Sequence, residues 1–231
     1  VLYVKGSGWD LAAIEPSGFP ACRLEQLLDC TKLEQLSDED MVKALRSQML
    51  APSSPTPSVE ALLHALLPAR YVDHTHANAV LAVVDQPDGS ARAREVWGDD
   101  VLLVPYVMPG FVLARRVAEL GDRVHQRPLM VLEKHGIFTW GDTARESYDR
   151  MIDAVTLAER YVEKARARGP LVAMPSENPA ERRARQRRAS PIIRGALCRA
   201  PDGAPLILDW RDEPDVLSLL ERPDASRVTQ I

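Results

Sequence analysis

The sequence predicts a layered α/β domain, because short apolar segments alternate with longer segments of helical periodicity. The chain has 231 residues, 45% of them hydrophobic, which is enough to bury one substantial core. Apolar runs at 102–106 and 129–133 are typical of strands, and the stretches at 111–126 and 143–167 carry helical spacing. A sheet built in this way is covered by helices, so we expect a three-layer α/β/α sandwich.

The chain begins with an apolar segment, Val1–Val4, whose β-branched and aromatic side chains favour a strand. Gly6-Ser7-Gly8 follows as a turn of small residues. Because a strand normally follows an earlier element, we expect a further segment before Val1.

Two helices are predicted next, over 24–33 and 37–50. Ser37 and Asp40 form a capping pattern at the start of the second helix, because the Ser37 hydroxyl can accept a hydrogen bond from a first-turn N–H. Three prolines within 51–57 then remove backbone donors and predict a loop.

A short helix, a strand and another helix are predicted after this loop. Ser58 is expected to cap a helix over 59–67, and 70–73 is expected to form a strand that enters a His-Thr-His triplet at 74–76. A helix over 77–84 follows.

The C-terminal part of the chain differs in character, so we divide the chain into a domain over 1–180 and an extension or linker over 181–231. The basic run at 181–188 is more typical of a solvated surface than of a phosphate site. The segments 192–197 and 205–210 are predicted to be strands of a small appendage.

Composition argues against several classes of partner. The net charge is −4, so we expect no nucleic-acid partner. Cys22, Cys30 and Cys198 are odd in number and lack C-x-x-C spacing, which predicts neither a disulfide framework nor a thiolate zinc site. Without a leader pattern or a long uncharged apolar run in the sequence, we expect a cytoplasmic protein that makes no membrane contact.

Histidine placement carries the main chemical signal. His74 and His76 are two residues apart, a spacing that points both side chains to one side of an extended chain. His135 follows an apolar strand, and the Gly136 after it permits a tight turn and the close approach of other groups. Three neutral imidazoles with a vacant fourth position are typical of catalytic zinc, so these histidines are candidate metal ligands.

Taken alone, the histidine spacing fits a structural role at a strand end equally well. His64 and His125 lie on helical stretches, where we expect them to pack or to face solvent, and we leave both outside the site.

Glu60 is the candidate catalytic acid/base. It lies near the predicted start of a helix, where the macrodipole favours a carboxylate whatever its function. The functional interpretation is a base beside a metal, because a proton next to a carbonyl is removed only if the resulting enediolate is stabilised.

Several of these motifs, taken in order, resemble the class II aldolase/adducin family. The resemblance covers about residues 1–167 and rests on V-K-G-S-G-W-D-L at 4–11, P-S-V-E at 57–60, H-T-H at 74–76 and K-H-G at 134–136. More narrowly, the first of these motifs and H-T-H-A are similar to the aldolase half of bacterial rhamnulose-phosphate aldolase/short-chain dehydrogenase fusion proteins. The segment 193–197 is similar to the part that joins the two halves.

The resemblance implies a mixed central sheet and a role for each matching residue. His74, His76 and His135 would bind Zn²⁺, and Glu60 would be the catalytic acid/base. Phosphate-binding positions fall on Ser7, Gly8 and Ser58.

The sequence also departs from the family pattern. Val59 replaces a serine of the phosphate motif, and nothing matches the family's G-N-x-S loop. No G-x-G-x-x-G motif supports NAD binding, so the dehydrogenase half would lie outside this chain.

By resemblance, the reaction would be the metal-assisted cleavage of a ketose 1-phosphate, a phosphorylated sugar, to dihydroxyacetone phosphate and a small aldehyde such as lactaldehyde. The family also implies a homotetramer, and the apolar residues of 111–126 would supply contact surface or pack within the subunit. Three alternatives remain: a sugar-phosphate 4-epimerase, which by resemblance has Asp in place of Glu60, a dehydratase of the same fold, and an adducin-like module without metal ligands.

Overall fold

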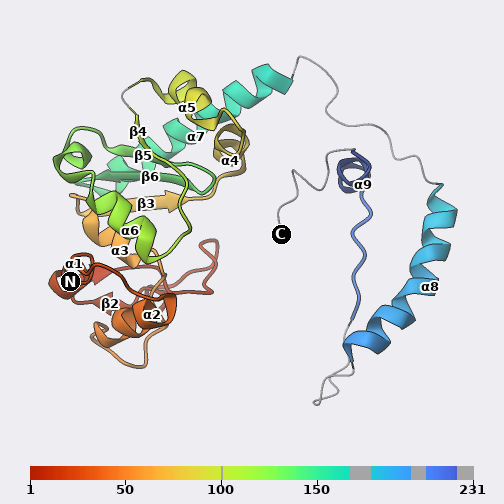
Figure 1. Ribbon diagram of the computed structural model, residues 1–231, viewed down its shortest axis with the longest axis horizontal. Helices are drawn as coiled ribbons and strands as arrows, with labels where there is room; N and C mark the ends of the chain where they lie inside the picture. Colours follow the sequence, from red (N-terminus) through yellow and green to blue (C-terminus); the bar gives the residue numbers. More distant parts are fainter. Residues whose placement is uncertain (100, 167–177, 199–206, 223–231) are drawn as a thin grey trace. The chain divides into compact units, whose positions relative to one another are not determined.

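The computed structural model describes residues 1–99, 101–166, 178–198 and 207–222 (Figure 1). The chain divides into two compact units, Val1–Ala165 and Arg166–Ile231. A domain boundary at 180, as predicted from the sequence, stays a prediction.

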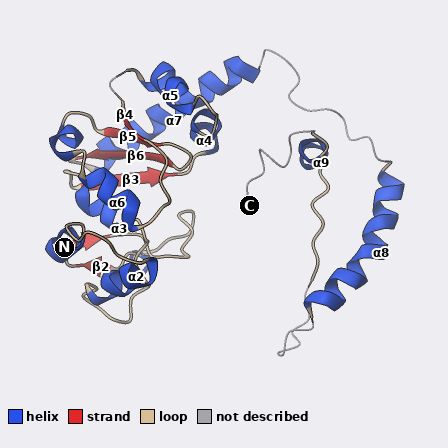
Figure 2. Ribbon diagram, in the orientation of Figure 1, coloured by secondary structure: helices blue, strands red, loops and turns tan. Residues whose placement is uncertain are grey.

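The first unit is built on a four-stranded mixed sheet, as predicted (Figure 2). Its strands lie in the order β3 (Tyr71–Thr75), β6 (Gly136–Gly141), β5 (Leu129–Leu132) and β4 (Leu102–Val104). β6 is antiparallel to both of its neighbours, whereas β4 and β5 are parallel. β6 was not predicted from the sequence, and β3 continues to Thr75, two residues beyond its predicted end at 73.

Alternate residues of the strands face two separate cores, which makes this unit a three-layer α/β/α sandwich. Met130, Leu132 and Phe138 pack with the helices of one layer, whereas Val131 and Ile137 pack with those of the other. Because successive side chains of a strand point to opposite faces, the period of two fills both cores from the same strands.

Seven α-helices of this unit cover the sheet or flank it. The first core contains residues of α1 (Leu24–Cys30), α2 (Asp38–Ser47), α3 (Ala61–Leu66) and α6 (Phe111–Ala118). The second contains residues of α4 (Asn78–Val84), α5 (Gly89–Trp97) and α7 (Ala144–Arg166). Figure 1 shows α3 and α6 on one side of the sheet and α4, α5 and α7 on the other.

Several helix boundaries correct the expectations. α2 is capped as predicted, since Ser37 Oγ accepts a hydrogen bond from Asp40 N at 3.1 Å. α3 begins at Ala61 rather than at 59, because the chain at 58–60 is still in a turn. α6 ends at Ala118 and is followed by a separate 3₁₀ turn, Gly121–His125, so the helix predicted over 111–126 is interrupted; Gly121, with φ 52°, lies at the break.

The N-terminal segment forms a small sheet of its own and ties down the loop before α3. β1 (Leu2–Tyr3) pairs antiparallel with β2 (Ala21–Cys22), and a 3₁₀ turn, Pro16–Gly18, precedes β2. Ser58 N donates to Lys5 O at 3.0 Å, and Ser7 N donates to Thr56 O at 2.8 Å. The backbone of Lys5 is therefore bonded to Ser58, which lies two residues before Glu60 in the sequence.

Where the structure describes the second unit, at 178–198 and 207–222, it contains the helices α8 (Pro179–Leu197) and α9 (Pro214–Leu220). The strand predicted over 192–197 is wrong, because those residues continue α8 beyond Pro191. Of the strand predicted over 205–210, residues 207–210 are not a strand, and 205–206 lie outside the described residues. Trp210 Nε1 instead donates to Ser190 Oγ at 2.9 Å.

None of the helices in the described ranges is both long and apolar enough to cross a membrane.

Candidate metal centre

Four polar side chains from separate parts of the first unit converge on one spot. Their ligand-type atoms lie within 4.8 Å of one another, and the residues are Glu60, His74, His76 and His135, which we call the Glu/His cluster. His74 Nε2 is 2.9 Å from His76 Nε2. Glu60 Oε1 lies 3.1 Å from His74 Nε2, 2.8 Å from His135 Nε2 and 3.6 Å from His76 Nε2.

The sheet fixes the ring of His74 and its tautomer. His74 lies in β3 opposite Phe138 of β6, and the two rings stack with centroids 3.9 Å apart. Its Nδ1 is 2.9 Å from the carbonyl oxygen of Ile137. Because a carbonyl only accepts, Nδ1 carries the proton, and Nε2 is left as a lone-pair donor directed at the cluster.

His135 belongs to the tight connection between β5 and β6. Its N–H donates to Leu132 O at 3.2 Å, and the preceding Lys134 has a positive φ of 53°, which is uncommon for a residue other than glycine. Glu133 anchors the connection, since its N–H donates to Val104 O at 3.0 Å and its carboxylate accepts from Tyr106 N at 3.3 Å. His135 Nδ1 is buried and has no hydrogen-bond partner in the described part of the chain, so Nε2 is the nitrogen that reaches the cluster.

Gly136 leaves room for the two other histidines. A Cβ atom at this position would lie 2.5 Å from Thr75 O, 3.0 Å from His76 Cδ2 and 3.2 Å from His74 Cε1. The first of these neighbours is backbone of the adjacent strand and cannot move by itself. The glycine therefore allows the cluster to assemble against β6.

We expect Gly136→Ala to lower stability by about 1–3 kcal/mol, the usual effect of overpacking a filled interior. It should also weaken metal binding by at least roughly tenfold, because the displaced groups carry or flank two ligand rings. Urea unfolding and metal titration would measure the two effects. Gly195→Ala is the matched control, since its Cβ would meet no atom within 4 Å; equal metal affinity in the two variants would contradict the assignment.

Glu60 sits at the N-cap position of α3, held in place by its neighbours. Its N–H donates to Ser58 Oγ at 3.3 Å. Burial would raise the pKa of Glu60, but its contacts with the rings of His135, His74 and His76 together hold that pKa well below its usual range. The side chain is therefore a carboxylate at neutral pH, and it in turn raises the pKa of His76, chiefly through their hydrogen bond and against the effect of burial.

The donor set of the cluster fits a metal ion. Imidazole nitrogens and a carboxylate oxygen are ligands that Zn²⁺ and other divalent transition metals accept. The tautomer of His74 directs the lone pair of its Nε2 at the cluster, and the Nε2 atoms of all three histidines converge on one carboxylate oxygen of Glu60. These four residues could hold a metal, with Glu60 in the position that three histidines would otherwise leave open.

The cluster opens into a cleft of about 520 Å³. Ser58 lines this cleft together with Lys5 and His64, and its phosphate role stays a prediction. Ser7 and Gly8 are exposed and are not among the lining residues, so their phosphate role stays a prediction. Tyr3, Leu11 and Phe19 give the cleft an apolar portion.

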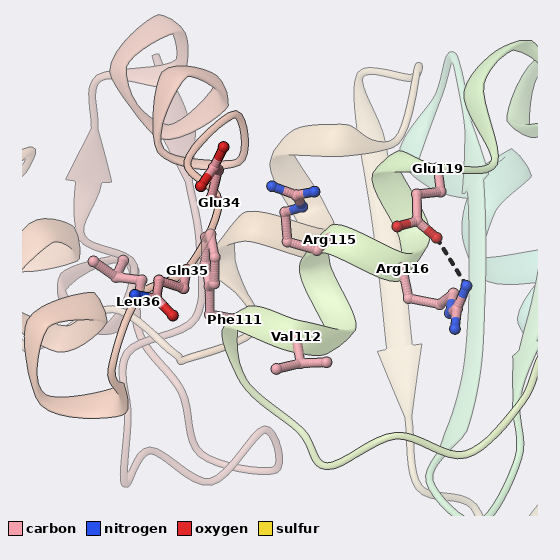
Figure 3. Close-up of a pocket in the computed structure, with 8 residues that line it drawn as sticks. All are labelled: Glu34, Gln35, Leu36, Phe111, Val112, Arg115, Arg116 and Glu119. Carbon is pink, nitrogen blue, oxygen red and sulfur yellow. Dashed lines mark hydrogen bonds and ion pairs between the residues drawn. The ribbon is translucent and has the colours of Figure 1, made fainter.

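A second, smaller hollow of about 230 Å³ lies between α6 and the segment 34–36 (Figure 3). Arg116 and Glu119 pair with each other at 2.9 Å on its wall. None of the cluster residues lines this hollow, so the described chemistry belongs to the larger cleft.

Comparison with known proteins identifies the family. The model of the class II aldolase and adducin N-terminal domain matches residues 1–162. The chain therefore belongs to the class II aldolase/adducin family, as the sequence motifs predicted.

Two relatives illustrate the match. A solved N-terminal class II aldolase domain of a conserved protein from Thermoplasma acidophilum is 39% identical and has a TM-score of 0.65, covering 69% of this chain and 74% of that one. An uncharacterized oxidoreductase, YuxG, from Bacillus subtilis (strain 168) is 33% identical over 234 residues. That alignment takes in 100% of this chain but only 34% of the relative.

Two residues of the cleft escaped the sequence analysis. His64 was left outside the site because a helix position alone does not say which face is covered. Lys5 was part of a motif but was given no role, although it is the single Lys or Arg among the described residues that line the cleft.

Proposed function

We propose that this chain catalyses zinc-dependent aldol cleavage of a ketose 1-phosphate to dihydroxyacetone phosphate and a small aldehyde such as lactaldehyde. The observation that carries the proposal is the contact of one carboxylate, Glu60, with three imidazoles beside a cleft of substrate size. Aldol cleavage needs an electrophile that stabilises an enediolate and a group that moves a proton at the neighbouring carbon. The cluster offers candidates for both.

His74, His76 and His135 would hold Zn²⁺, which as a Lewis acid supplies the charge that stabilises the enediolate. Glu60 would carry the proton at the enediolate carbon. A carboxylate whose pKa is held low by three histidines is a weak base, so release of Glu60 from these contacts toward the cleft is part of the proposed role.

Two features of the cleft support a phosphorylated substrate. Ser58 offers a hydroxyl, and Lys5 offers the one ammonium or guanidinium group among the described residues that line the cleft. The Lys5 ammonium contacts Gly6 O at 3.4 Å and forms no ion pair within the described residues. Its charge is therefore available for an anionic group of the substrate.

The alternatives of the same fold use a similar metal site. A 4-epimerase or a dehydratase would also need a metal and a proton carrier, and family membership alone does not separate them from an aldolase. Glu60 favours the aldolase over the epimerase by resemblance. The intact set of three histidines argues against a non-catalytic adducin-like module.

We expect the zinc-loaded protein to release dihydroxyacetone phosphate from L-rhamnulose 1-phosphate. A coupled reductase assay and NMR of the products would measure this release. Unphosphorylated L-rhamnulose should react more slowly, because it lacks the anion that Lys5 and Ser58 would bind. An epimerised or dehydrated product without dihydroxyacetone phosphate would instead support one of the alternative enzymes.

We also propose a homotetramer. On α6 the side chains of Phe111, Ala114 and Val117 are buried within the unit, whereas Val112 is 61% exposed. The apolar surface left for contact on this helix is therefore small, and other elements would have to contribute.

A further inference from the structure

His64, which was expected to pack or to face solvent, lines the same cleft as the Glu/His cluster. It lies on α3 one turn after Glu60, with its N–H bonded to Glu60 O at 3.1 Å. Residues four apart on a helix share a face, so both side chains lie on the same side of α3. Both residues accordingly line the same cleft.

The ring of His64 is held by aromatic contact rather than by hydrogen bonds. Its centroid is 5.4 Å from that of Phe138 in an edge-to-face arrangement, and Phe138 stacks on His74. Within the described residues no hydrogen bond reaches the His64 side chain. Phe138 thus connects the position of His64 to that of a candidate metal ligand.

His64 is also a neutral group. Burial and the nearby His74 lower its pKa to about 4, against a smaller opposite influence of Glu60. A neutral imidazole offers one N–H donor and one acceptor nitrogen. No protein group occupies either nitrogen within the described residues, so both are available to an oxygen atom of a molecule bound in the cleft.

We propose that His64 is a substrate-binding residue, which hydrogen-bonds a carbonyl or hydroxyl oxygen of the phosphorylated ketose or of its three-carbon product. The assignment rests on the proposed function, because it takes the substrate class from there. It adds a polar contact to those proposed for Lys5 and Ser58 in the same cleft. A hydrogen bond of this kind selects for an oxygen at a fixed distance from the metal site.

The test compares two probes on zinc-loaded protein by calorimetry, dihydroxyacetone phosphate and inorganic phosphate. In His64→Phe the aromatic contact with Phe138 is kept while both hydrogen-bonding atoms are lost. We expect dihydroxyacetone phosphate to bind about threefold to tenfold more weakly, as for the loss of one hydrogen bond, with inorganic phosphate and zinc content unchanged. His64→Gln, which keeps a donor and an acceptor, should recover part of the loss.

The outcomes separate this inference from the proposed function. Unchanged binding of dihydroxyacetone phosphate by His64→Phe, or equal weakening of both probes, would overturn the role of His64 and leave the aldolase proposal standing. Wild-type protein that binds phosphate but not dihydroxyacetone phosphate would overturn the aldolase proposal and the His64 role together. His64→Leu, measured in the same way, replaces His64→Phe if that variant does not fold.

Discussion

Alanine in place of His74, His76 or His135 is expected to weaken zinc binding by at least roughly a hundredfold, because each change deletes one of the converging ligand atoms. His76→Ala is the cleanest of the three. Its side chain is 55% exposed, whereas those of His74 and His135 are 7% and 5% exposed. Loss of metal in that variant would therefore not be confused with a cavity in the interior.

Elemental analysis after dialysis and competition with a chelating dye would measure the zinc content and the affinity. His125→Ala is the matched control, since this exposed histidine lies on a 3₁₀ turn outside the cluster. Stoichiometric zinc retained by any two of the three cluster variants would show that the ligands are assigned wrongly.

The histidine pair shows what a sequence pattern can establish. Spacing of two residues on an extended chain predicts that both side chains point the same way, and His74 and His76 do meet at 2.9 Å. The approach of His135 depends on a hairpin with a left-handed residue, Lys134, in its turn. That convergence is a tertiary property, which the motif order of a family suggests but which periodicity alone does not contain.

The elements that were missed have weak local signals. All six residues of β6 are buried, so the strand lacks the alternation of polar and apolar residues that marks a half-exposed strand. Residues 192–197 are mostly apolar but include Arg194, a short pattern that fits a strand or a helix equally well, and they continue the helix that begins at Pro179. In both cases the neighbours, not the segment itself, decide the structure.

The role of His64 was missed for a related reason. Helical spacing does place it on the face of Glu60, but only the fold shows that this face borders a cleft. A polar residue four positions after a candidate catalytic carboxylate is a signal that could have been followed.

Glu60→Gln is expected to reduce the rate by at least roughly a hundredfold, the usual contribution of a positioned acid/base group, while zinc content changes little. Glutamine keeps the size of the side chain and an oxygen near the three imidazoles, but it cannot take a proton. The full-length protein is the proper material for the cleavage assay, because the chain spans 34% of the length of its Bacillus subtilis relative.

One half-reaction isolates the proton transfer from the rest of the cycle. If Glu60 carries the proton at the enediolate carbon, zinc-loaded protein should exchange a carbon-bound hydrogen of dihydroxyacetone phosphate with deuterium from solvent, which NMR can follow without any aldehyde. Glu60→Gln should bind this compound and fail to exchange it, whereas Glu39→Gln, an exposed carboxylate of α2, should behave as wild type. Exchange at a near-normal rate in Glu60→Gln would assign the proton transfer to another group, and because the His64 test measures binding alone, that result would leave it intact.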